Sequence, residues 1–214
     1  MKVRCRMLFQ LESLEVRKFL SASMGLVGDR LLICGTPGDD VLTATWNPGG
    51  GNPTMTVALN GQTKTFNANK VTNVRAELGD GDDDLTFGGA IWRRMTVYLG
   101  AGDDYAFTGG RNDVVRGGDG NDTVNSSAGD DTIYGDAGND VLEGASGDDV
   151  IYGGAGDDDL GGWTGYNKLY GEDGNDEFWG FSRGSGKIVG GDGYDRVWAL
   201  GSNWSTECVE VIRR

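Results

Sequence analysis

Aspartate and glycine recur with a period of nine residues through the middle of the sequence. From Leu99 to Trp179 the chain divides without a gap into nine nonapeptides, of which GGDGNDTVN is one. The fourth position is glycine and the sixth is aspartate in eight of the nine. Carboxylate and carbonyl oxygens are the ligands that Ca²⁺ prefers, and glycine allows the positive φ of a tight turn that directs carbonyls inward. The repeat therefore has the residue types of a site for a hard cation.

The eighth position of every nonapeptide is apolar, and it indicates the element that positions the turn. The residues are Ala106, Val115, Val124, Ile133, Leu142, Ile151, Leu160, Leu169 and Phe178. One apolar residue per repeat predicts a very short strand with one side chain in a narrow core. We therefore expect six residues of turn and three of strand in each nine-residue repeat. A disordered acidic tail is the alternative for such a composition, but it gives no reason for the apolar position to persist.

The segment GGDGNDTVN, residues 117–125, resembles the RTX (hemolysin-type) calcium-binding nonapeptide GGxGxDxUx at every fixed position. The resemblance covers residues 99–179. It implies an all-β fold, a right-handed parallel β-roll (β-solenoid) with non-repeat β caps. In that fold two nonapeptides complete one turn, and Ca²⁺ lies between loops two repeats apart. Less regular copies flank the block: GTPGDDVLT (35–43), LGDGDDDLT (78–86) and GGDGYDRVW (190–198).

Stacking of every second loop would produce two rows of candidate calcium ligands. The first row contains Asp104, Asp122, Asp140, Asp158 and Asp176, with Gly102, Gly120, Gly138, Gly156 and Gly174. The second row contains Asp113, Asp131 and Asp149, with Gly129 and Gly147. In this row Arg111 replaces the first glycine and Asn167 replaces the last aspartate. We expect about four sites in the first row and one good site, between Asp131 and Asp149, in the second, so about five Ca²⁺ ions.

Charge and composition limit the function. The net charge is −14, with no histidine, and residues 99–179 contain 19 acidic and 3 basic side chains, a net −16. Such a chain repels nucleic acid and anionic membranes, and no apolar run is long enough to span a bilayer. Without histidine, Ser-His-Asp sites and His-ligated zinc are excluded, and we expect no enzymatic activity. Ca²⁺ would relieve the repulsion, so we expect folding to depend on it.

These features predict a monomeric, calcium-stabilised structural or adhesive repeat protein, located outside the cell or on its surface. One alternative is a calcium-dependent secretion or folding module of a larger exported protein. A further alternative is the non-catalytic part of an RTX hydrolase. Calcium ions are the expected partners, and no nucleic acid is expected.

Three tyrosines recur every 18 residues at the ninth position of the second row: Tyr134, Tyr152 and Tyr170. We expect them to lie on one outer face of the roll at a spacing of about 4.8 Å. A stacking ladder that stabilises the sheet is one interpretation. The alternative is an aromatic surface that binds a glycan or a surface partner.

The sequence predicts four segments. Residues 1–24 are basic and are expected to be a disordered leader or sorting segment, in which LESLEVRKFLSA resembles the LEPR-XLL-type signature of planctomycete surface proteins. Residues 25–98 are expected to be a strand-rich start of the solenoid, with a hairpin turn at Asn60-Gly61. Residues 99–198 form the calcium-binding roll, and residues 199–214 a C-terminal cap. A bridge between Cys34 and Cys208 is open, as are free thiols.

Overall fold

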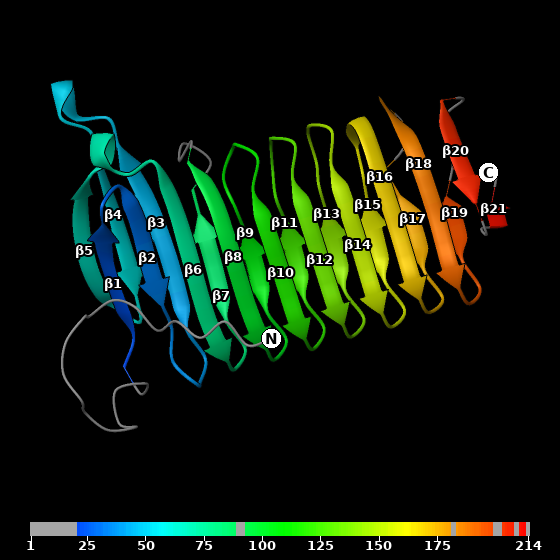
Figure 1. Ribbon diagram of the computed structural model, residues 1–214, viewed down its shortest axis with the longest axis horizontal. Coiled ribbons are helices and arrows are strands. Elements are labelled where there is room, and N and C mark those ends of the chain that lie inside the picture. The colour runs from blue at the N-terminus through cyan, green and yellow to red at the C-terminus, as the bar shows by residue number, and fades with distance from the viewer. Residues whose placement is uncertain (1–20, 89–92, 181–182, 199–202, 208–209, 213–214) are drawn as a thin grey trace.

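A computed structural model describes residues 21–88, 93–180, 183–198, 203–207 and 210–212. In these residues two β-sheets face each other and form a flattened parallel β-solenoid of about seven turns (Figure 1). The helical elements in this described part are two 3-10 turns, η2 (Gly49–Gly51) and η3 (Ala68–Lys70). No helix among these residues has the length and apolar character to cross a membrane. The predicted all-β parallel roll is confirmed.

The first sheet has ten strands. In spatial order they are β1 (Ser23–Val27), β2 (Arg30–Cys34), β6 (Asn73–Asp80), β8 (Arg94–Ala101), β10 (Val114–Asp119), β12 (Thr132–Ala137), β14 (Val150–Ala155), β16 (Thr164–Asp173), β18 (Arg183–Asp192) and β20 (Trp204–Glu207).

The second sheet has eleven strands. In spatial order they are β21 (Glu210–Ile212), β19 (Arg196–Trp198), β17 (Glu177–Trp179), β15 (Asp159–Gly161), β13 (Val141–Glu143), β11 (Thr123–Asn125), β9 (Tyr105–Phe107), β7 (Asp84–Phe87), β3 (Val41–Asn47), β4 (Thr54–Leu59) and β5 (Gln62–Asn67).

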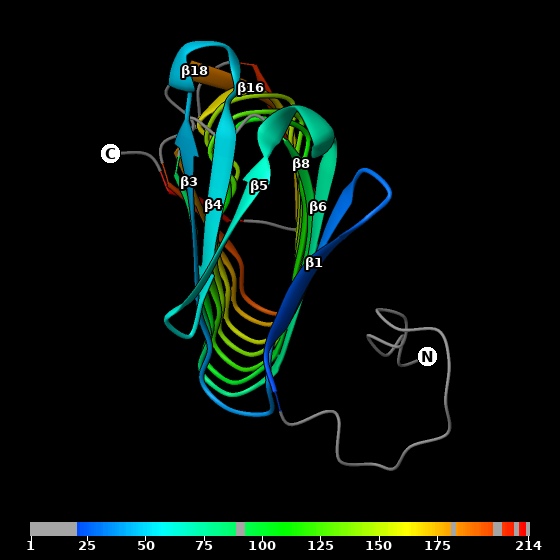
Figure 2. The same ribbon diagram turned by 90° about the vertical axis from the view of Figure 1, so that its left-hand side faces the viewer.

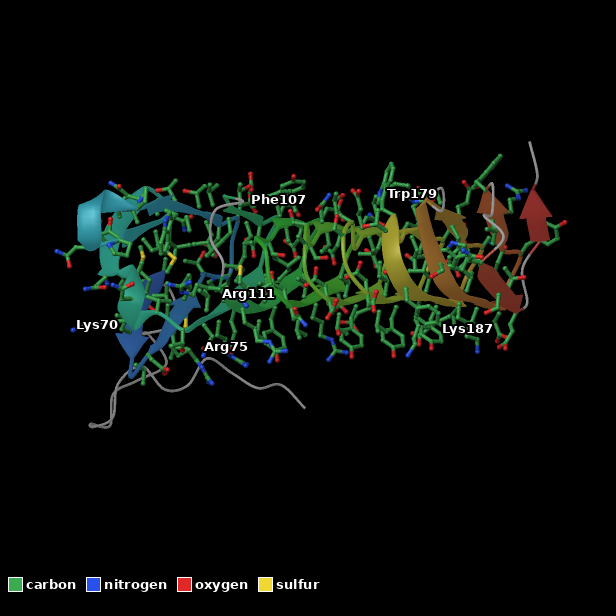
Figure 3. The ribbon with its side chains drawn as sticks, turned by 90° about the horizontal axis from the view of Figure 1, so that it is seen from above. Lys70, Arg75, Phe107, Arg111, Trp179 and Lys187 are labelled. Carbon is green, nitrogen blue, oxygen red and sulfur yellow. The ribbon has the colours of Figure 1, made fainter. Side chains whose placement is uncertain are left out.

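In the regular repeats the core is a single file of apolar side chains from each sheet, whereas in the N-terminal turns a strand such as β8 buries three, Met95, Val97 and Leu99. In the regular part each strand pairs in parallel with the strand 18 residues later, so that Val115 lies opposite Ile133 and Val124 opposite Leu142. The eighth-position residues of all nine repeats are at most 1 % exposed. Figure 3 shows the narrow interior, with Phe107 and Trp179 on the outside of one sheet and Lys187 on the outside of the other. Because the core is so thin, the loops must supply much of the remaining stability.

Strand length differs between the two sheets, which the repeat pattern does not predict. Strand β11 has the expected three residues, but β10 has six and continues into the next nonapeptide. After Gly117, pairing resumes at Gly118, which lies opposite Gly100 and Asp136. Gly118 has φ +133°, and a Cβ there would meet the Gly100 carbonyl oxygen at 1.9 Å. Glycine at this position therefore lets the strand bend and remain paired.

Antiparallel strands complete the N-terminal end of the solenoid. Strand β1 pairs antiparallel with β2, and β3, β4 and β5 form an antiparallel meander. Asn60 and Gly61, with φ +50° and +75°, make the predicted hairpin turn between β4 and β5. Figure 2 looks onto this end and shows β4 and β5 in front of the stacked turns. Such strands cover the first rung of a solenoid, whose edge and core would otherwise be exposed.

Parts of the predicted flanking segments lie outside the described residues. These parts are residues 1–20 of the leader and residues 199–202, 208–209 and 213–214 of the C-terminal cap. Cys34 is disulfide-bonded. This excludes a free thiol at Cys34. Cys5 and Cys208 lie outside the described residues, so the choice between them as its partner stays open.

Candidate metal centre

The sixth-position aspartates of the first row form one continuous column along an edge of the roll. The N–H of Asp104 donates to Oδ1 of Asp122 at 3.0 Å, and the N–H of Asp122 donates to Oδ1 of Asp140 at 2.7 Å. The same bond links the whole column, which consists of Asp40, Asp83, Asp104, Asp122, Asp140, Asp158, Asp176 and Asp195. The structure thus adds members from the less regular flanking copies to the five predicted aspartates. Asp40, Asp83 and Asp195 occupy the sixth position of these flanking nonapeptides, and this shared position is the sequence signal that identifies them.

The second row forms a shorter column along the opposite edge. The N–H of Asp113 donates to Asp131 Oδ1 at 2.7 Å, and that of Asp131 donates to Asp149 Oδ1 at 3.0 Å. The column ends at Asn167, whose Oδ1 accepts from the Asp149 N–H at 2.8 Å. The structure therefore brings together the predicted residues of each row and keeps the two rows apart.

Fourth-position glycines let successive loops stack closely. All the predicted glycines have φ between +128° and +145°: Gly102, Gly120, Gly138, Gly156, Gly174, Gly129 and Gly147. A Cβ on Gly120 would meet the carbonyl oxygen of Gly102, in the preceding loop, at 2.1 Å. Arg111 adopts the same backbone, with φ +130°. The predicted requirement for positive φ is thus met even where the residue is unsuited to it.

One carboxylate oxygen of nearly every column aspartate is buried and accepts no hydrogen bond. These atoms are Oδ2 of Asp83, Asp104, Asp113, Asp122, Asp131, Asp140, Asp149, Asp158, Asp176 and Asp195. The residues are at most 3 % exposed. A buried carboxylate oxygen without a partner is costly, and a bound cation or proton removes that cost. Asp40 differs from them, because the N–H of Thr36 donates to its Oδ2.

Burial raises the pKa of nine of these carboxyls. The pKa of Asp122 rises to about 8, mainly through burial and also through the charges of Asp104 and Asp140, although the N–H of Asp104 opposes the rise. Burial is the largest cause in the other loops too. It raises the pKa to about 7 at Asp83, Asp113, Asp149 and Asp158, and to about 6 at Asp104, Asp131, Asp140 and Asp176. The columns thus favour bound positive charge at neutral pH.

Asn167 shows which kind of group lies next to the Oδ2 position of a column residue. Its Nδ2 takes the place of an aspartate Oδ2 and donates to the carbonyl oxygen of Gly162. In the first row, a methyl group built on Gly117 would lie 2.1 Å from Asp122 Oδ2 and 2.7 Å from the Gly135 carbonyl oxygen. Two oxygens from successive loops therefore converge there. Carboxylate and carbonyl oxygens are the ligand types that Ca²⁺ prefers.

Carboxylates alone do not complete a metal site. In the ranges that the structure describes, no group of three or more His, Cys, Asp or Glu side chains is placed to hold one ion. Each gap adjoins the aspartates of two successive loops. Backbone carbonyls would therefore have to supply the remaining ligands of a Ca²⁺ ion, which commonly takes six to eight oxygens.

A parallel β-solenoid with columns of buried aspartates along its edges defines a class of metal-binding repeat proteins. Residues 98–133, 134–169 and 162–180 match the RTX calcium-binding nonapeptide repeat. Residues 98–180 therefore consist of hemolysin-type calcium-binding repeats, as the sequence indicates. No curated protein and no solved structure matches the chain. The LEPR-XLL-type resemblance of the N-terminus gains no support, because the match is confined to the repeats.

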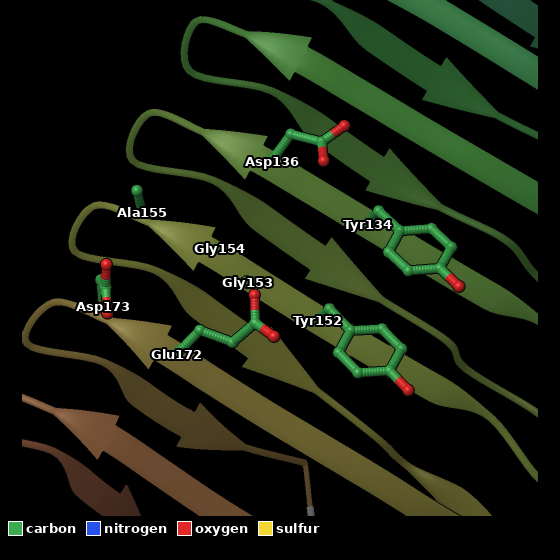
Figure 4. Close-up of a pocket in the computed structure, with 8 residues that line it drawn as sticks. All are labelled: Tyr134, Asp136, Tyr152, Gly153, Gly154, Ala155, Glu172 and Asp173. Carbon is green, nitrogen blue, oxygen red and sulfur yellow. The ribbon is translucent and has the colours of Figure 1, made fainter. Parts of the chain in front are cut away.

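The predicted tyrosine ladder lies on the outer face of the first sheet. The ring centroids of Tyr134 and Tyr152 are 5.0 Å apart, and those of Tyr152 and Tyr170 are 4.9 Å apart. The interplanar angles are 4° and 10°, so the rings stack face to face. The guanidinium of Arg116 lies 5.5 Å from the Tyr134 centroid, so it extends the stack. Figure 4 shows Tyr134 and Tyr152 side by side, with Asp136 further along the strand that carries Tyr134.

Proposed function

We propose that the roll is a calcium-stabilised structural or adhesive element that works outside the cell, either released or on the cell surface. The observation that carries this proposal is the column of buried aspartates whose Oδ2 atoms accept no hydrogen bond. The net charge of −16 over residues 99–179 opposes folding without cations. Extracellular Ca²⁺ modules bind in the range of about 10⁻⁴ to 10⁻³ M. Folding would therefore follow exposure to extracellular calcium, because binding free energy becomes folding free energy.

The proposed role is not catalytic. The sequence has no histidine, and the sixth-position carboxylates are used in regular columns rather than as an acid and base pair in a cleft. A calcium-triggered folding module of a larger exported protein would use the same chemistry. That alternative is supported by the frequent occurrence of RTX repeats in secreted proteins. We propose a monomer in either case.

The tyrosine ladder fits a structural role better than glycan binding. Sugars stack on open aromatic faces, but both faces of Tyr152 are covered by Tyr134 and Tyr170. A glycan or surface partner would therefore have to use the ring edges and hydroxyls. Loss of such a ligand after replacement of all three tyrosines by alanine, with the fold retained, would favour that binding role.

Circular dichroism of the full chain tests the proposed function. In excess EDTA at neutral pH we expect the β-sheet signal to be largely lost. About 5 mM free Ca²⁺ should restore it, because this concentration exceeds the dissociation constants of about 10⁻⁴ to 10⁻³ M that extracellular modules have. Mg²⁺ at equal ionic strength is the control for charge screening, because it demands a tighter octahedral site. A full β-sheet signal in excess EDTA would contradict the proposal.

A further inference from the structure

Cys34 is the last residue of β2, which is the second strand of the ten-stranded sheet at the N-terminal end of the roll. Leu31 and Ile33, on the same strand, are buried in the core. Because successive side chains of a strand point to opposite faces, the Cys34 side chain lies on the outer face of this sheet. It is half-buried there and forms a disulfide bond.

The chain contains two candidates for the partner of Cys34. It has three cysteines, so the sulfur bonded to Cys34 within the chain belongs to Cys5 or to Cys208. Neither of these two residues is among the described ones. The described residues through which each of them joins the roll, Ser23 and Glu207, therefore have to decide between the candidates.

Cys208 joins the roll too far from Cys34. In the register of the first sheet Cys34 lies opposite Glu77, and the same register continues strand by strand through the tyrosine ladder to Glu207. Strand β20, which carries Glu207, is the eighth strand after β2 and lies at the opposite end of the roll (Figure 1).

The length of a disulfide cannot span this separation. Eight steps between neighbouring strands, each of about 4.8 Å, place Glu207 about 38 Å from Cys34. A disulfide joins Cα atoms that are about 4 to 7 Å apart. Cys208 is bonded directly to Glu207, and consecutive Cα atoms are only about 3.8 Å apart. Cys208 therefore cannot reach Cys34 in the folded chain.

The segment that carries Cys5 enters the fold directly beside Cys34. Strand β1 is the edge strand of the sheet and pairs antiparallel with β2, and its first residue, Ser23, lies opposite Cys34. Residues opposed in this way have Cα atoms about 4.5 to 5.5 Å apart. Cys5 precedes Ser23 by 18 residues. The segment needs only to return to its own point of entry to bring the two sulfurs together.

We propose that Cys5 and Cys34 form a disulfide that fastens the basic N-terminal segment to the first turns of the roll. A cut between the two residues would then leave this segment attached until the bond is reduced. Cys208 keeps its thiol, because no cysteine of the chain remains to pair with it. Disulfides persist outside the cell, where thiols are not kept reduced. The bridge thus agrees with the proposed location and does not depend on calcium binding.

Formation of the bond transfers two electrons and two protons from the two thiols to an oxidant that itself contains a disulfide. The thiolate of one cysteine attacks the disulfide of the oxidant, forms a mixed disulfide and releases one thiol. The thiolate of the other cysteine then displaces the second sulfur of the oxidant. One S–S bond forms in the chain and one breaks in the oxidant, which leaves in its reduced form.

Peptide mapping of the full chain tests the pairing. The protein is folded in Ca²⁺ and a glutathione redox buffer, its thiols are blocked with N-ethylmaleimide in denaturant, and it is digested with trypsin without reduction. We expect residues 31–64, which contain Cys34, to be joined to the dipeptide 5–6. Residues 197–213 should carry the blocking group on Cys208. Any other partner of Cys34, or a blocking group on it, would overturn the inference and leave calcium binding standing.

Two matched variants test the pairing by the number of thiols that react in denaturant without reduction. The wild type should show one reactive thiol per chain, that of Cys208. Cys208→Ser should show none, because the bridge remains. Cys5→Ser should show two, because Cys34 loses its partner. Two thiols in Cys208→Ser, or none in Cys5→Ser, would mean that Cys34 pairs with Cys208 and would overturn the inference. Circular dichroism in Ca²⁺ checks that each variant is folded.

Discussion

Each column aspartate divides its two oxygens between two tasks. Oδ1 accepts the N–H of the aspartate in the preceding loop, as Asp140 does from Asp122 at 2.7 Å. Oδ2 is left for a positive charge, and burial makes that charge necessary. Asn167 keeps the first task and gives up the second, because its amide donates to Gly162 instead. Replacement of one carboxylate oxygen by an amide nitrogen therefore keeps the hydrogen bond between the loops but removes the oxygen that a cation would contact.

Replacement of Arg111 by glycine should stabilise the protein. Arg111 has φ +130°, a backbone that L-residues avoid, and its side chain is exposed. Relief of such strain is worth about 1–3 kcal/mol. Urea denaturation in saturating Ca²⁺ would measure the gain for Arg111→Gly. The control is Arg111→Ala, which removes the charge but keeps the strained backbone. Equal gains for the two variants would show that the backbone is not the cause.

At the scale of strands, stability comes from stacking identical elements 18 residues apart. Each pair of stacked turns in the regular repeats has one buried apolar contact per sheet and one aspartate bond at each edge. In part of the first sheet it also has one tyrosine contact. The nearly parallel rings at 5.0 Å and 4.9 Å match the spacing of neighbouring strands. The ladder is therefore a direct result of the repeat period.

Tyr152→Ala should destabilise the calcium-bound protein more than alanine at an unstacked tyrosine. Tyr152 stacks on both Tyr134 and Tyr170, and aromatic pairs contribute about 0.5–1.5 kcal/mol each beyond buried area. We therefore expect a loss of about 1–3 kcal/mol in urea denaturation. Tyr166→Ala is the control, because Tyr166 is 52 % exposed and lies outside the ladder. Similar losses of unfolding free energy in both variants would show that ring stacking does not contribute to stability.

Over the whole molecule, the buried columns make stability depend on protons as well as calcium. The pKa values of nine column carboxyls are raised to between about 6 and about 8, above 3.8 for ordinary aspartate. At pH values between 3.8 and about 8, the folded state therefore binds more protons than the unfolded chain. The stability of the calcium-free fold must fall as the pH rises through this window, because each raised carboxyl then loses its proton.

Calcium-free protein should consequently retain more β structure at about pH 5 than at about pH 8, which follows from the sign of the proton linkage. Circular dichroism and urea denaturation in EDTA at the two pH values would measure this. In saturating Ca²⁺ the dependence should reverse, because protons compete with the metal for the same oxygens. A calcium-free fold that is more stable at pH 8 would contradict the burial of unpaired carboxylates.

The nine-residue pattern by itself determined the alternation of turn and short strand and the apolar core position of each repeat, because both depend on one local unit. Its resemblance to the RTX nonapeptide implied the parallel roll and the two separate rows of aspartates. In that fold the 18-residue spacing places the three tyrosines on one outer face. The hairpin at Asn60-Gly61 was predictable because its turn chemistry is local.

Only the tertiary structure decided which groups contact the two oxygens of each column aspartate. At Asp40 the N–H of Thr36 donates to Oδ2, and Nδ2 of Asn60, which lies in a hairpin turn 20 residues later in the chain, donates to Oδ1. The Oδ2 atoms of the other column aspartates accept no hydrogen bond. The repeat pattern does not predict this difference, because the donors come from residues outside the repeated positions.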